Sequence, residues 1–233
     1  MLKTQRSQEL EWIDLGPSYY TLQEYQGCLY QLDRVGRLLG GDQATWSAFN
    51  QLKFSPTSIV DVGCGGGLFT LRLGEHYPNA HVLGTDLSQE AIAFAQQQPA
   101  RSNVQFMIPP TPELHFDPKT FDVVTSTLVC HHLTDEQLID FLKRACRVAK
   151  KAVILNDLHR HPLAIASFSM IAPPLFRNRL ISHDGVLSIR RGFTKQELKD
   201  LLLAAGIPLA ACSITWHWAF RWILSIDTST QDL

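Results

Sequence analysis

The sequence predicts an α/β protein in which helices cover a mostly parallel β-sheet. From about residue 58 to residue 157, short apolar runs rich in Val and Ile alternate with helix-like stretches, a pattern typical of parallel strands joined by crossover helices. The 233 residues, 45% of which are hydrophobic, are enough for one such domain with additional helices. We therefore expect an N-terminal helical cap at 1–55 and a main domain at 56–233, with a second cap inserted at about 159–192. The alternative is that both segments are ordinary packing helices.

Five strands of the sheet are predicted from the apolar runs. They are Ser58–Val62, His81–Asp86, Val104–Ile108, Phe121–Thr127 and Ala152–Asp157. Two helices are predicted from capping boxes, in which a Thr and an acid or amide three residues later bond each other's backbone. One box pairs Thr134 with Gln137, and the other pairs Thr194 with Glu197.

A closing β-hairpin is expected after the second of these helices, which stops at Gly206. Its strands are predicted at Leu209–Thr215 and Trp218–Ile226. Trp216, His217, Trp218 and Trp222 are interpreted as alternating at strand spacing, so we expect them to serve the sheet core.

The composition argues against several classes of function. The 21 Lys and Arg nearly balance the 22 Asp and Glu and form no long basic run, which argues against nucleic acid as the main partner. No stretch of about 20 uninterrupted apolar residues is present, so no membrane span is expected. The apolar segment Leu163–Leu180 could cover an apolar pocket or touch a membrane surface, and we favour the pocket. Five scattered cysteines and a start without an apolar signal core indicate a cytoplasmic protein with reduced thiols.

A glycine-rich loop follows the first predicted strand. Glycines between a strand and a helix let the backbone approach a ligand closely, next to the unpaired N–H groups of the helix start. Asp61 precedes Gly63, and a carboxylate there would repel a pyrophosphate but attract the ammonium of S-adenosylmethionine. Leu68 also stands where a dinucleotide loop has its third glycine. Both observations favour S-adenosylmethionine over NAD.

A second acid stands at the end of the second predicted strand. Asp86 is placed to accept hydrogen bonds from both ribose hydroxyls of such a cofactor, and Leu87 is placed to pack on the adenine. The alternative is that Asp86 only caps the next helix, but Ser88 is better placed for that role. The loop and the two acids together predict a cofactor site.

The sequence resembles the class I S-adenosylmethionine-dependent methyltransferases of small molecules. IVDVGCGGG is similar to their first motif, LGTDLS to their second and FDVVTSTLVCHHL to their fourth-strand motif. The resemblance covers about 58–226 and implies a Rossmann-like, doubly wound sheet of seven strands with one antiparallel strand. NDLHRHP and SIRRGFTKQEL are similar to bacterial members associated with polyketide, phenolic or quinone biosynthesis.

One position departs from the family pattern. Where the family has an acid near the adenine amino group, this chain has Pro109, Pro110 and Thr111, so adenine recognition is expected to use backbone groups or Thr111. The residues expected to contact the cofactor are Asp61, Gly63, Cys64, Gly65, Gly67, Asp86, Leu87, Thr111 and Thr127.

Candidate catalytic residues follow the fourth and fifth predicted strands, because ligands in such sheets bind beyond the carboxyl ends of the strands. His131 is the candidate general base and Asp157 its orienting partner, since a carboxylate-held histidine takes up protons near neutral pH. Some O-methyltransferases with a similar segment use such a pair. The alternative is a hydrogen-bonded turn histidine. His132 either caps the helix or faces the acceptor.

Several residues outside these motifs are candidates for acceptor binding. Aromatic and basic side chains suit an aromatic or anionic acceptor, although packing tyrosines and surface arginines would look the same. The candidates are Tyr19, Tyr20, Tyr25, His132, His159, Arg160 and Arg190. No metal site is predicted, because the histidines at 159, 161 and 183 lack tight ligand spacing.

The sequence thus predicts an enzyme that methylates a small molecule. Transfer to oxygen of an aromatic, phenolic or polyketide-like acceptor is favoured. Carbon methylation of a quinol or polyketide ring is one alternative. A cofactor-binding protein without methyl transfer is another.

Overall fold

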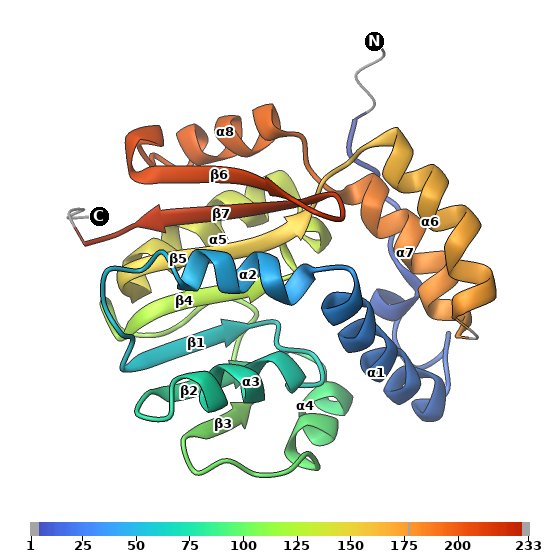
Figure 1. Cartoon of the computed structure of the whole chain (residues 1–233), viewed down its shortest axis with the longest axis horizontal. Helices are drawn as coiled ribbons and strands as arrows, with labels where there is room; N and C mark the ends of the chain where they lie inside the picture. The colour runs from blue at the N-terminus through green and yellow to red at the C-terminus, as the bar shows by residue number, and fades with distance from the viewer. Residues whose placement is uncertain (1–4, 177, 230–233) are drawn as a thin grey trace.

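The computed structural model describes residues 5–176 and 178–229, which contain a seven-stranded sheet (Figure 1). The strand order is β3-β2-β1-β4-β5-β7-β6. The strands are β1 (Ser58–Val62), β2 (His81–Thr85), β3 (Val104–Met107), β4 (Phe121–Thr127), β5 (Ala149–Leu158), β6 (Cys212–His217) and β7 (Arg221–Asp227). β7 runs antiparallel to both β5 and β6, and the pairs among β1 to β5 are parallel. The predicted Rossmann-like sheet with one antiparallel strand is confirmed.

The C-terminal hairpin differs from its prediction at both strands. Residues 209–211 form a short 3-10 helix before β6, and residues 218–220 form the turn before β7. Trp216 and Trp218 are 47% and 66% exposed, so the prediction that they serve the core was wrong, whereas Trp222 is 8% exposed. Trp216 lies on the edge strand β6 and Trp218 lies in the turn after it, and alternation along a strand does not reveal whether anything covers its faces.

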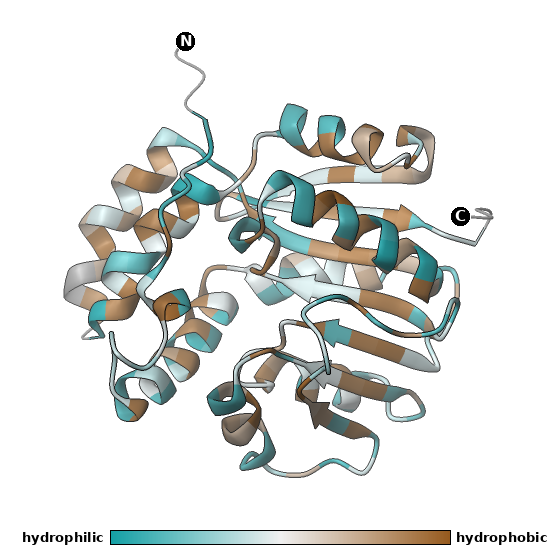
Figure 2. Ribbon diagram, turned by 180° about the vertical axis from the view of Figure 1, so that it is seen from behind, coloured by the Kyte–Doolittle hydropathy of each residue, from teal (hydrophilic) through white to brown (hydrophobic). Residues whose placement is uncertain are grey.

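Two layers of helices enclose the sheet. On one face, α2 (Gly41–Phe49) and α3 (Leu68–His76) pack on a cluster that includes Ile59. On the other, α5 (Asp135–Val148) and α8 (Lys195–Ala204) pack on a cluster that includes Val60. Successive residues of β1 therefore face opposite layers, which explains why the strands read as continuous apolar runs. Figure 2 shows this apolar character along the central strands.

Both predicted capping boxes are present, at the starts of α5 and α8. A third box, formed by Thr21 and Glu24, opens α1 (Leu22–Leu38). Each box satisfies two backbone N–H groups that a helix start would otherwise leave unpaired.

Three helices gather beyond the carboxyl ends of β1 and β5: α1, α6 (Pro162–Leu175) and α7 (Arg179–Arg191) (Figure 1). α1 and α7 pack together and against α4 (Gln89–Gln96) through apolar side chains. By contrast α2, although it lies within 1–55, packs on β5 and β7. Before α1, residues 5–21 contain a single 3-10 turn, Trp12–Leu15.

Part of the apolar surface of α6 faces outward, although Ala164 and Ala172 are buried. Leu163, Met170 and Leu175 are 64%, 76% and 65% exposed, so these side chains do not cover the pocket that we expected beneath this segment. In the part of the chain that the structure describes, no helix combines the length and the apolar character needed to cross a membrane.

Candidate active site

The glycine loop after β1 can hold only glycine at two positions. Gly63 has φ +70°, and a Cβ there would lie 2.3 Å from the Val129 side chain. Gly67 has φ +71° at the N-cap of α3, and its Cβ would lie 2.5 Å from Phe106. The N–H groups of Gly63 and Cys64 both donate to the Thr85 carbonyl, which fixes the loop to the end of β2. The close packing explains the glycine pattern seen in the sequence.

Asp86 lies at the end of β2 and joins the two cofactor motifs. Its Oδ2 accepts from the Gly65 N–H at 2.8 Å, and its Oδ1 accepts from the Ser88 N–H at 2.9 Å. Burial raises the pKa of the Asp86 carboxyl, against the opposing effect of these N–H donors. Ser88 itself caps α4, as the sequence analysis expected. The carboxylate is therefore held at the glycine loop rather than used as a helix cap.

The residues around this loop fit the adenosyl and methionine parts of S-adenosylmethionine. Leu87 and Ile108, which follow β2 and β3, are 58% and 43% exposed and offer apolar surface for an adenine. The Oγ1 of Thr127 is buried and lacks a hydrogen-bond partner among the described residues. It ends β4, next to β1, where the strand order reverses and ligands bind in such sheets. An unpaired hydroxyl there suits a polar ligand group.

Asp61 and Thr111, two of the predicted cofactor contacts, make hydrogen bonds to other residues of the chain. The carboxylate of Asp61 is 2% exposed and accepts a 2.7 Å hydrogen bond from the Thr70 hydroxyl. Burial raises its pKa to about 7, against the opposing effect of that hydrogen bond. Thr111 bonds to Glu113 and His115 in its own loop. Burial also raises the pKa of the Cys64 thiol.

The predicted acceptor tyrosines lie on or before α1, which covers the glycine loop. The Tyr25 hydroxyl donates to Ser88 Oγ at 3.0 Å, so this side chain lies beside Asp86. Tyr20 stacks on Tyr25 with ring centroids 5.1 Å apart. Tyr19 is 46% exposed. The structure thus brings two of the three tyrosines to the cofactor side of the site.

His131, in the turn after β4, contacts Asp157, which lies near the end of β5. The Nδ1 of His131 lies 2.7 Å from Asp157 Oδ1, and the His131 N–H donates to Oδ2 at 3.1 Å. Both residues are buried, and Asp157 also accepts from the Leu158 N–H. Burial alone would raise the pKa of Asp157, but the charge of His131 and these hydrogen bonds outweigh it and lower the pKa. The predicted pair is therefore in contact, with its imidazole oriented by the carboxylate.

Two acids from the N-terminal segment complete this cluster, and the sequence analysis missed both. Glu11 is 3% exposed, and its Oε1 lies 3.6 Å from His131 Nε2. Burial raises the pKa of Glu11 despite the two nearby histidines. Asp14 Oδ2 lies 2.9 Å from His132 Nδ1. Burial would lower the pKa of His132, but the contact with Asp14 and the charge of Glu11 outweigh it and raise the pKa.

Two arginines hold the N-terminal segment against the histidines. Arg6 donates to the carbonyls of His131 and Leu133 and forms an ion pair with Asp135. Arg191, on α7, is buried and donates to the carbonyls of His131, His132 and Glu9. These contacts join segments that are distant in sequence, and they place Glu11 beside the histidines.

Two predicted acceptor residues make contacts elsewhere, and a third is exposed. Arg160 donates to the Gly192 carbonyl and forms an ion pair with Glu197, so it joins β5 to α8. The His159 Nδ1 accepts from the Trp216 indole, and burial together with the charges of His161 and Arg160 lowers its pKa to about 4. Arg190 is exposed.

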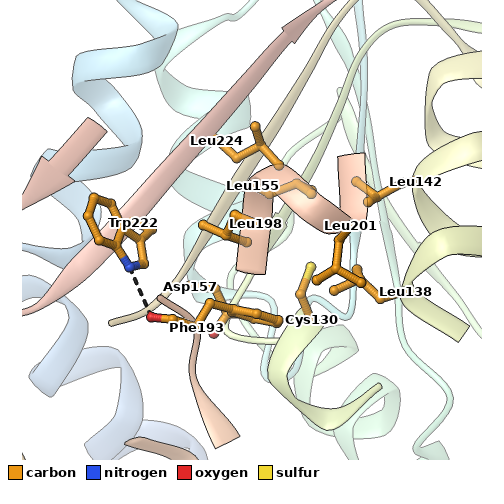
Figure 3. Close-up of a pocket in the computed structure, with 10 residues that line it drawn as sticks. All are labelled: Cys130, Leu138, Leu142, Leu155, Asp157, Phe193, Leu198, Leu201, Trp222 and Leu224. Atoms are coloured by element: carbon orange, nitrogen blue, oxygen red, sulfur yellow. Dashed lines mark hydrogen bonds between the residues drawn. The ribbon is translucent and has the colours of Figure 1, made fainter. Parts of the chain in front are cut away.

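Two cavities adjoin this cluster. The one drawn in Figure 3 has a volume of about 20 Å³ and is lined mainly by aliphatic core residues with Asp157 at one side, so it holds a water at most. The second has a volume of about 360 Å³ and a mixed polar and apolar lining. Asp14, His131, His132 and Arg191 contribute to that lining. Its size suits a small acceptor.

The comparisons with known proteins identify the family of this chain. A family model described as a methyltransferase domain matches residues 59–152. A demethylmenaquinone methyltransferase of Shouchella clausii is 34% identical over 167 residues, which cover 65% of this chain and 70% of that protein. The chain belongs to the class I S-adenosylmethionine-dependent methyltransferase family, and its cofactor is S-adenosylmethionine.

Other relatives match over shorter regions. A tRNA1(Val) (adenine(37)-N6)-methyltransferase of Vibrio cholerae is 33% identical over 75 residues, 32% of this chain and 28% of that protein. A ubiquinone biosynthesis O-methyltransferase of Coxiella burnetii is 30% identical over 89 residues, 37% of each chain. These matches therefore span only about a third of those relatives.

Solved structures share the fold. The plantazolicin methyltransferase BpumL, crystallised with S-adenosylhomocysteine, has a TM-score of 0.70 at 16% identity and covers 93% of this chain and 91% of its own. At that identity the likeness concerns the fold.

Proposed function

We propose that this chain transfers the methyl group of S-adenosylmethionine to an oxygen of a small aromatic, phenolic or quinol acceptor, with His131 as general base. The observation that carries the proposal is the contact between His131 Nδ1 and Asp157, which leaves His131 Nε2 as the proton-accepting atom. When bound, the cofactor supplies a methyl group on a sulfonium, which is open to in-line displacement.

The proposed step transfers one proton and one methyl group. The acceptor hydroxyl gives its proton to His131 Nε2, and its oxygen forms a bond to the methyl carbon while the carbon–sulfur bond breaks. S-adenosylhomocysteine and the methyl ether are the products. Asp157 keeps its negative charge and stabilises the imidazolium that forms. The cavity of about 360 Å³ that includes His131 in its lining is the proposed acceptor site.

Two of the similar proteins support a small acceptor with a quinone-like ring. They are a demethylmenaquinone methyltransferase and a ubiquinone biosynthesis O-methyltransferase. The net charge of −1 gives no basis for strong binding to nucleic acid, although one relative is named for tRNA. The five unpaired cysteines suit a reducing compartment such as the cytoplasm. We place the enzyme in the biosynthesis of small molecules.

Carbon methylation is the second candidate, and the demethylmenaquinone methyltransferase relative favours it. In that reaction the same base would deprotonate a phenol, and the ring carbon rather than the oxygen would take the methyl group. His131 is placed to act as the base for methylation at oxygen and for methylation at carbon.

Radiolabelled S-adenosylmethionine and a panel of phenols, quinols and polyketide-like aromatics test the proposal. We expect a labelled product from wild-type protein and a loss of about 10²–10⁴-fold in turnover for His131→Gln. Mass spectrometry and NMR of the product distinguish oxygen from carbon attachment. Cofactor binding without product from any acceptor would favour a binding protein, and equal turnover by the variant would remove His131 from the role of base.

A further inference from the structure

The cluster around His131 has the composition of a transition-metal site. The carboxylate of Glu11 and the imidazoles of His131 and His132 each offer a ligand atom, and these atoms lie within 4.8 Å of one another. The distances from Glu11 are 3.6 Å to His131 Nε2 and 4.0 Å to His132 Nε2. Ligand atoms that share one Zn²⁺ at about 2.0–2.1 Å lie roughly 3.3 Å apart, so small side-chain rotations would complete the site.

Both imidazoles are already oriented for coordination. His131 contacts Asp157 through Nδ1, and His132 contacts Asp14 through its own Nδ1. A carboxylate on one ring nitrogen fixes the tautomer and leaves the lone pair of the other nitrogen for a metal. In this chain both of those Nε2 atoms face Glu11, which comes from a segment far away in sequence.

The Oε1 atom of Glu11 gives a second, independent indication of a ligand. It is buried, and the described part of the chain offers it no hydrogen-bond partner. The 3.6 Å separation from His131 Nε2 is too long for a hydrogen bond. A buried carboxylate oxygen without a donor is costly unless a cation satisfies it.

The charges around the cluster also favour a cation. The carboxylates of Glu11, Asp14 and Asp157 surround two imidazoles. The neighbouring Arg6 and Arg191 direct their donors to backbone carbonyls and to Asp135 instead.

We propose that Glu11, His131 and His132 form a binding site for a divalent transition metal such as Zn²⁺, with Asp14 and Asp157 as the residues that orient the two imidazoles. Imidazole ligands favour Zn²⁺ and its transition-metal neighbours over Mg²⁺ and Ca²⁺. The site opens to the cavity of about 360 Å³, whose lining includes both histidines.

Metal binding has a consequence for catalysis that rests on the proposed function. The ion would occupy the Nε2 lone pair of His131, which is the pair that accepts the acceptor's proton. A loaded protein therefore has no free base, so metal occupancy and proton transfer to His131 exclude each other. Zn²⁺ then acts as an inhibitor that is removed by a chelator.

Calorimetry with ZnCl₂ tests the binding on chelator-treated full-length protein, without cofactor or acceptor. We expect one ion per chain, and binding at least about 10-fold weaker in Glu11→Gln and in His132→Gln. Glu9→Gln is the matched control, because Glu9 is an exposed acid of the same segment. Co²⁺ should give visible absorption bands in the wild type that both ligand variants lose. Thermal unfolding reports whether each variant is folded, and His132→Gln provides a second test if Glu11→Gln is not.

Two results would overturn the metal site: no saturable binding to the wild type, or equal affinities for the wild type and both folded ligand variants. A separate titration with S-adenosylmethionine distinguishes this failure from a failure of the proposed function. Metal binding can be found in a protein that methylates nothing, and methyl transfer can be found in a protein that binds no metal.

Discussion

The carboxylate of Asp157 accepts from both the backbone and the ring of His131: the amide lies 3.1 Å from Oδ2, and Nδ1 lies 2.7 Å from Oδ1. The pair links the turn after β4 to the end of β5. Because one carboxylate fixes both the turn and the ring, the orientation of Nε2 depends on Asp157.

Asp157→Asn should therefore impair turnover more than cofactor binding. The amide side chain can still accept one hydrogen bond, but it lacks the negative charge that stabilises the imidazolium and it can select the wrong tautomer. We expect kcat to fall by about 10²–10⁴-fold with the acceptor found in the panel. Calorimetry with S-adenosylhomocysteine should give a Kd within about 2-fold of the wild type. Full turnover by Asp157→Asn would show that Asp157 has a structural role and does not assist His131 in proton transfer.

Asp86→Asn should weaken cofactor binding. The carboxylate is held at the glycine loop by the Gly65 and Ser88 amides and is expected to accept from the ribose hydroxyls. Hydrogen bonds to a charged group contribute about 1.5–3 kcal/mol, so the Kd for S-adenosylmethionine should rise about 10–100-fold. Calorimetry measures this change. Asp117→Asn, an exposed acid outside the site, serves as the control and should bind like the wild type.

Asp61→Asn should stabilise the ligand-free protein at alkaline pH. Burial raises the pKa of Asp61 from 3.8 to about 7. A carboxyl with a raised folded-state pKa contributes its stability below about pH 4 and loses it as pH rises through 7. An amide does not ionise, and its oxygen can still accept from Thr70.

The gain in free energy of unfolding over the wild type should reach at most about 4 kcal/mol at pH 8 and be close to zero near pH 4. Urea unfolding at both pH values measures it. The same variant should bind S-adenosylmethionine more weakly if the carboxylate attracts the ammonium. A gain that is equal at both pH values would mean that Asp61 is ionised in the folded protein.

The cofactor half of the site could be predicted from the sequence because it is local. Asp61 lies near the end of β1, and the glycine loop and Asp86 follow β1 and β2. Both strands read clearly as apolar runs, so the positions of these residues relative to the sheet follow from the fold. The contact between His131 and Asp157 could be predicted for the same reason, since His131 follows β4, Asp157 lies near the end of β5, and the two strands are neighbours.

The other half could not be predicted, because it depends on contacts between distant segments. Glu11 and Asp14 lie in a segment without strand or helix periodicity, and Arg6 and Arg191 place them beside the histidines. Arg160 illustrates the same limit. It follows β5 as the sequence indicated, but its guanidinium bonds to Glu197 rather than to the acceptor side, and no sequence pattern encodes that direction.

Gly63→Ala should destabilise the fold far more than Gly206→Ala, although both glycines have a positive φ. Gly206 has φ +76° and nothing within 4 Å of an added Cβ, so alanine there meets only the backbone strain of about 1 kcal/mol. At Gly63, with φ +70°, the same strain is joined by a Cβ only 2.3 Å from Val129. Overpacking of this kind adds about 1–3 kcal/mol. Urea unfolding should therefore separate the two variants, and only Gly63→Ala should also lose S-adenosylmethionine binding in calorimetry. If both variants lost the same free energy of unfolding, backbone strain alone would explain why position 63 is a glycine. Close packing against Val129, in the turn after β4, would then not be the reason.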